Sequence, residues 1–92
     1  MANAIVTIKI MPESPETDLK ALAEKTKVFM KEFSGKDEFK VEEKPVAFGI
    51  KSLNITFVMD EQLGSPEELE KKIAALDEVT SAETINVTRA VG

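Results

Sequence analysis

The segment Ile50–Met59, with the sequence IKSLNITFVM, decides the fold of this 92-residue chain. Its large apolar residues occupy alternate positions, and those that share one face are Leu53, Ile55, Phe57 and Met59. A period of two residues with β-branched and aromatic side chains is typical of a strand that buries one face. Ile50 is out of phase with this set, which predicts a bulge or bend near Lys51 and Ser52.

Three more segments predict strands. Ala4–Met11 alternates in the same way and is followed by two prolines, which cannot donate to a ladder. Asp37–Lys44 predicts a short edge strand that Pro45 interrupts. Val79–Val91 predicts the last strand, in which one face is expected to be shared by Val79, Ser81, Ile85 and Val87.

Two segments have the three- and four-residue spacing of amphipathic helices. Asp18–Phe33 is expected to be capped by its first residue or the one before it and to end at Gly35. Its apolar stripe consists of Leu19, Leu22, Thr26, Phe29, Met30 and Phe33. The second helix has Ser65 as its predicted cap, Pro66 at its first position and Glu68 to complete a capping box. Its buried stripe is Leu69, Ile73 and Leu76.

The order of these elements is β-α-β-β-α-β, and right-handed crossovers leave few topologies for it. It predicts an α+β fold, the ferredoxin-like βαββαβ plait, in which both helices cover one face of a four-stranded antiparallel sheet. A chain of 92 residues is expected to form one domain over residues 1–92. The residues expected to face the helices are Val6, Ile8, Ile55 and Phe57. Those expected on the open face are Ile5, Thr7, Lys9, Asn54, Thr56 and Val58, which make a mixed surface.

Four residue types are missing from the sequence: Cys, His, Trp and Tyr. Their absence excludes thiolate nucleophiles, Cys- or His-based metal sites and Ser-His-Asp triads. We therefore predict no cofactor, no metal site and no catalytic residue. Carboxylates alone could bind a hard cation at Asp60–Glu61 or Glu67–Glu68, but their spacing matches no calcium loop. A solvated loop and a helix N-terminus explain them better.

The charge balance is 12 basic against 17 acidic residues, a net charge of -5. Because affinity for nucleic acid comes from clustered Lys and Arg, no direct nucleic-acid partner is expected. No run approaches the ~20 apolar residues of a membrane span, and the chain does not start with a signal-peptide pattern. We expect a cytoplasmic protein without a membrane partner.

Fold alone does not decide the function of a plait, but residues exclude several of its functions. An acylphosphatase would need an Arg-containing phosphate loop where this chain has Pro12–Pro15. A soft-metal chaperone would need paired Cys. An RNA-recognition domain would carry aromatic residues on its central strands, and Ala4–Met11 has none.

Two positions remain as candidates for contact with a partner. Phe48 stands beside Gly49, just before the central strand, and from composition alone it fits a plug at the end of the core better than a contact residue. Arg89 is the only Arg in the chain, although a single charge near the end of a strand is most often simply solvated.

Three blocks of sequence resemble a known family. They are Ile8–Pro15 (IKIMPESP), Pro45–Leu53 (PVAFGIKSL), and Asp60–Glu61 followed by Gly64 and Glu68–Glu70. Over nearly its whole length the chain is similar to the short archaeal form of the elongation factor 1-beta family. Members of this family are guanine-nucleotide exchange factors for elongation factor 1-alpha.

The resemblance implies a translation factor that is not an enzyme and that speeds release of GDP so that GTP can replace it. It implies contact with the G domain of the GTPase elongation factor 1-alpha, where the magnesium and phosphate site is disturbed. Phe48, Gly49 and Lys51 correspond to a contact segment. Arg89 corresponds to a basic residue directed at the magnesium site, which is Lys in eukaryotic members and lies nearer their C-terminus. A monomer is expected when the protein is free.

A different class of function stays open as the alternative. It is a small-molecule-sensing regulatory domain of the plait type that dimerises through its sheet.

Overall fold

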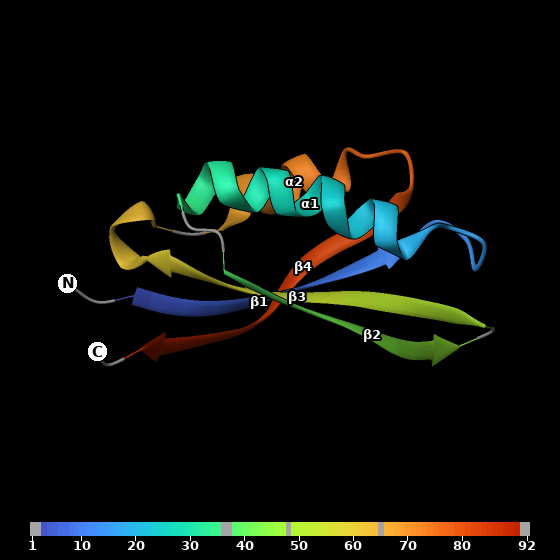
Figure 1. Cartoon of the computed structure of the whole chain (residues 1–92), viewed down its shortest axis with the longest axis horizontal. Helices are drawn as coiled ribbons and strands as arrows, with labels where there is room; N and C mark the ends of the chain where they lie inside the picture. The colour runs from blue at the N-terminus through green and yellow to red at the C-terminus, as the bar shows by residue number, and fades with distance from the viewer. Residues whose placement is uncertain (1–2, 36–37, 48, 65, 91–92) are drawn as a thin grey trace.

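Two helices lie on one face of a four-stranded antiparallel sheet with the strand order β2-β3-β1-β4 (Figure 1). A computed structural model describes residues 3–35, 38–47, 49–64 and 66–90. Its elements are β1 (Asn3–Pro12), α1 (Leu19–Ser34), β2 (Phe39–Ala47), β3 (Ile50–Asp60), the 3-10 helix η1 (Glu61–Leu63), α2 (Glu67–Ala74) and β4 (Val79–Ala90). The predicted ferredoxin-like plait is confirmed.

The core lies between the sheet and the helices. The four residues predicted to face the helices are at most 1% exposed: Val6, Ile8, Ile55 and Phe57. Across from them, α1 buries Leu22, Thr26 and Met30, and α2 buries Leu69 and Ile73. These positions match the predicted stripes, because residues three and four apart share one face of a helix.

Both ends of α1 lie where the sequence predicts them. Asp18 is the N-cap, and its Oδ1 accepts hydrogen bonds from the backbone N–H groups of Lys20 at 3.1 Å and Ala21 at 3.3 Å. Gly35 ends the helix at φ 72°, in the left-handed region that glycine adopts without strain. In α2 the helix begins at Glu67, one residue later than predicted, so Pro66 precedes the first turn. The predicted cap Ser65 lies outside the described residues.

Strand β2 is longer than predicted. It continues through Pro45 to Ala47, because an edge strand tolerates the missing N–H of a proline. Pro45 pairs with Lys51 while Ala47 pairs with Ile50, so Val46 is an extra residue in this ladder. The irregularity predicted near Lys51 is thus present, but its extra residue belongs to β2 and not to β3.

The predicted face of β4 is only partly right: Val79 and Val87 pair with Pro12 and Val6 and share the helix-facing side, but Ser81 and Ile85 do not belong to it. Register shifts against β1 leave Thr80 and Ile85 as extra residues on β4. Each extra residue reverses the alternation of side chains beyond it. Val79 therefore packs in the core at 8% exposure, whereas Ser81 pairs with Met11 on the open face and Ile85 is 48% exposed.

An ion pair connects α1 to the loop before β4. The ammonium group of Lys25 donates to the carboxylate of Glu78, and this hydrogen bond lowers the pKa of Glu78, with a smaller contribution from its own backbone N–H. Because the folded-state pKa is depressed, the pair stabilises the protein above the ordinary pKa of a glutamate. That contribution is lost as the pH falls through the folded-state pKa.

The Lys25→Met variant should raise the pKa of Glu78 toward its ordinary value, because the donor that favours the carboxylate is gone. A carbon-detected NMR titration of the Glu78 carboxyl group measures this directly. The control is Lys20→Met, which removes another exposed lysine of α1. An unchanged Glu78 pKa in Lys25→Met would show that the ion pair does not form in solution.

Candidate functional site

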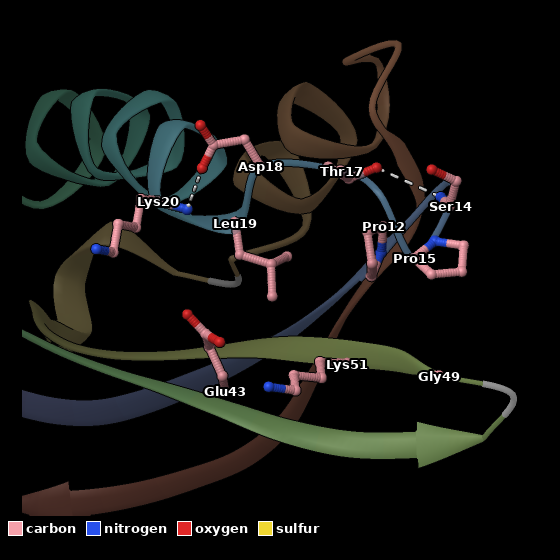
Figure 2. Close-up of a pocket in the computed structure, with 10 residues that line it drawn as sticks. All are labelled: Pro12, Ser14, Pro15, Thr17, Asp18, Leu19, Lys20, Glu43, Gly49 and Lys51. Atoms are coloured by element: carbon pink, nitrogen blue, oxygen red, sulfur yellow. Dashed lines mark hydrogen bonds between the residues drawn. The ribbon is translucent and has the colours of Figure 1, made fainter.

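One end of the sheet holds a cavity of about 330 Å³ between the β1–α1 loop and the β2–β3 turn (Figure 2). Two of the predicted contact residues line it, Gly49 in the turn and Lys51 on β3. Gly49 has φ 77°, so the turn needs a residue that adopts the left-handed region without strain. The third predicted contact residue, Phe48, lies outside the described residues.

Charged side chains of both signs surround this cavity. Lys20 from α1 and Lys51 from β3 contribute ammonium groups, and Asp18 and Glu43 contribute carboxylates. In Figure 2, Glu43 extends from β2 toward α1, and Leu19 points from the helix toward the sheet. The balance of two cations and two carboxylates fits a charged protein surface better than a polyanion.

The opposite end of the sheet holds Arg89. It lies on β4 opposite Ala4 of β1, and its Nε–H donates to Oε1 of Glu61 at 2.6 Å. The Arg89 side chain is 74% exposed and that of Glu61 is 32% exposed. Both line a second cavity of about 340 Å³, whose remaining lining is Ala4, Val6, Met59, Gly64, Pro66 and Val87. A guanidinium at the rim of a largely apolar cavity can offer hydrogen bonds to an anionic group.

The structure does not bring the predicted site residues together. Lys51 lies near the start of β3, whereas Met59, which is level with Ala4 and Arg89, lies near its end. From residue 51 to residue 59 a strand rises roughly 26 Å, at about 3.3 Å per residue. The chain therefore has two separate candidate surfaces, the hairpin end with Gly49 and Lys51 and the Arg89 end.

Sequence reasoning missed Glu61 as a partner of Arg89. The prediction of a solvated acidic loop at Asp60–Glu61 is incomplete, since Asp60 Oδ1 accepts from the Gln62 backbone N–H at 2.9 Å and Glu61 binds Arg89. No sequence signal links residues 61 and 89, which are close only because β3 and β4 flank β1. Within the described residues, no three carboxylates gather in a way that could hold a metal ion.

The open face of the sheet carries several polar contacts. Lys40, Glu42 and Lys44 of β2 form ion pairs of 3.3 and 3.9 Å along one row. The Thr7 and Thr56 hydroxyls hydrogen bond at 2.9 Å across the central strands. Asn54 is only 8% exposed on this face, less than predicted. Ile5 and Val58 form a cross-strand pair on the same face, so the face is mixed, as the sequence predicts.

The fold and these two ends define a class: a ferredoxin-like plait with charged candidate contact surfaces at both ends of its sheet. A family model described as the EF-1 guanine nucleotide exchange domain matches residues 5–90. The chain belongs to this family of exchange domains, as the sequence resemblance predicts. None of the described helices is long and apolar enough to cross a membrane.

Several archaeal proteins are similar to the chain over nearly its whole length. Elongation factor 1-beta of Methanosphaera stadtmanae is 42% identical over 90 residues, which cover 97% of this chain and 98% of that protein. Elongation factor 1-beta of Nanoarchaeum equitans is 40% identical and covers 90% of this chain and 100% of its own length. Elongation factor 1-beta of Methanocaldococcus jannaschii is 37% identical over 93 residues, which cover 98% of this chain and 100% of that protein.

Proposed function

We propose that this protein promotes exchange of GDP for GTP on elongation factor 1-alpha, with residues 1–92 acting as one exchange domain. The observation that carries this proposal is the match of an exchange-domain model to residues 5–90. In this role the protein makes and breaks no covalent bond. It accelerates exchange by binding the nucleotide-free GTPase more tightly than the nucleotide-bound form.

Arg89 supplies the cation in this mechanism. A bound magnesium ion and a diphosphate hold GDP on a GTPase largely by charge, so a cation delivered nearby competes for the same anionic ligands. Arg89 is suited to this because its side chain is 74% exposed at the rim of a cavity. The contact with the G domain thus disturbs the magnesium and phosphate site and lets the nucleotide leave.

The hairpin end makes a second contact. Phe48, Gly49 and Lys51 belong to the block that most closely resembles the family, and Gly49 and Lys51 line the cavity at this end. Because roughly 26 Å of strand separates Lys51 from the level of Arg89, the two surfaces reach different parts of the same partner. An elongation factor whose domains span that distance can bind both ends of the sheet at once.

The test is release of a fluorescent GDP analogue from the cognate elongation factor 1-alpha. The wild-type protein should accelerate release, and Phe48→Ala should slow the accelerated rate about five- to tenfold, the loss of a contact worth more than about 1 kcal/mol. Val46→Ala is the matched control, because Val46 is exposed in the same hairpin. No acceleration by the wild-type protein would contradict the exchange function itself.

Thermal melts separate contact from packing at Phe48. A contact residue should leave the melting temperature of Phe48→Ala close to that of the wild type. A large loss of stability, with exchange restored at low temperature, would assign Phe48 to the core. Size-exclusion chromatography over a range of concentrations tests the expected monomer, and a dimer would favour the small-molecule-sensing alternative.

A further inference from the structure

The side chain of Arg89 crosses a neighbouring strand to reach its partner. Ala4 of β1 pairs with Arg89 on one side and with Met59 on the other, so β1 separates Arg89 from the end of β3. Glu61 begins η1 directly after that end. The crossing runs over residue 4, an alanine with a small side chain, which lines the same cavity as Glu61 and Arg89.

The contact with Glu61 uses only one edge of the guanidinium. Arginine has five N–H donors, one on Nε and four on the two Nη atoms. Glu61 accepts from Nε, and this is the only ion pair that Arg89 makes among the residues that the structure describes. Toward the residues that the structure describes, the four Nη donors make no further ion pair, and the side chain that carries them is mostly exposed.

An exposed ion pair of this kind contributes little to stability. Its physical consequence is a restricted side chain, because a long arginine that would otherwise sample many rotamers is held at Nε. Restricting a side chain before binding removes part of the ordering cost that binding would otherwise carry.

We propose that Glu61 is a positioning residue for Arg89. It holds the guanidinium by its Nε edge and leaves the Nη groups to meet the anionic ligands of the partner's magnesium site. This inference rests on the proposed function, in which Arg89 is the competing cation. The opposite arrangement, a carboxylate that only neutralises Arg89, predicts faster exchange when the charge of Glu61 is removed.

Two substitutions of Glu61 separate these possibilities. Glu61→Gln keeps an oxygen that accepts from Nε–H, so exchange should stay within about twofold of wild type. Glu61→Ala loses the acceptor and should lower exchange about two- to tenfold, the range expected for one side chain that must be ordered on binding. Glu83→Ala is the control, because it removes the same charge from the open face of β4 without contacting Arg89.

A double-mutant cycle tests whether Glu61 acts through Arg89. In an Arg89→Ala background, adding Glu61→Ala should cause no further loss of exchange. NMR provides a readout that needs no partner, since Arg89 is the only arginine and its Nε–Hε resonance is assigned without ambiguity. That resonance should shift in Glu61→Ala and stay in place in Glu83→Ala.

Three results would overturn the positioning role. They are faster exchange in Glu61→Ala, an equal loss in the wild-type and Arg89→Ala backgrounds, or no loss in Glu61→Ala while Arg89→Ala is impaired. If Arg89→Ala itself exchanges like wild type, the assignment of Arg89 in the proposed function fails and the role of Glu61 falls with it. Normal exchange in Arg89→Ala therefore counts against the assignment of Arg89, whereas an abnormal result confined to Glu61→Ala counts only against the positioning role.

Discussion

The Ile73→Ala variant should unfold about 2–5 kcal/mol more easily than the wild type, through the lost side chain and the cavity that it leaves. Ile73 is fully buried, and α2 spans only the eight residues Glu67–Ala74. A helix this short is not stable by itself in water, so it depends on packing. Only Leu69 and Ile73 are buried within it, and Ile73 carries much of that packing.

Urea melts of Ile73→Ala and Val28→Ala provide the comparison. Val28 is an exposed aliphatic residue on α1, so its truncation should change the free energy of unfolding by no more than about 0.5 kcal/mol. A loss below about 0.5 kcal/mol for Ile73→Ala as well would mean that α2 is not docked on the sheet as the structure describes. Nucleotide exchange by the Ile73 variant should be normal wherever the variant is fully folded, because Ile73 is not exposed to a partner.

The Arg89→Ala variant should lower the stimulation of GDP release about thirtyfold, which corresponds to the roughly 2 kcal/mol of an interface hot spot. The fold should be intact, because an exposed charge contributes little to stability. Stopped-flow release of a fluorescent GDP analogue measures the exchange rate, and a thermal melt checks the fold. Lys72→Ala is the matched control, since it removes an exposed cation from α2.

Arg89→Lys and a magnesium series test the mechanism behind that loss. Arg89→Lys keeps the positive charge but loses the separate Nε edge that Glu61 holds, so its activity should lie between that of Arg89→Ala and the wild type. Excess magnesium should oppose the wild-type protein more strongly than Arg89→Ala. If Arg89→Ala matches the wild-type rate at every magnesium concentration, Arg89 is not the competing cation, and the hairpin end would have to account for exchange.

Much of the fold could be predicted from the sequence because it follows from local patterns. The alternation in β1 and β3 and the helical stripe of α1 each use residues only two to four positions apart, and burial in the structure follows them except at Ser52 and Asn54, which are also buried. The caps of α1 are local in the same sense. Prediction failed where one strand is shaped by another: the two extra residues of β4 and the extra residue of β2 exist only in the pairing with their neighbours.

The candidate site, too, was predictable from local sequence in part and depended on tertiary structure in part. The sequence by itself determined the fold class, the resemblance to an exchange-factor family, and the candidate residues Phe48, Gly49, Lys51 and Arg89, because these lie in short segments or stand out by residue type. Only the tertiary structure decided that Gly49 and Lys51 lie at one end of the sheet and Arg89 at the other. It alone also paired Arg89 with Glu61. The physical reason is that both facts depend on the strand order β2-β3-β1-β4, which long-range pairing and helix packing select and no local pattern encodes.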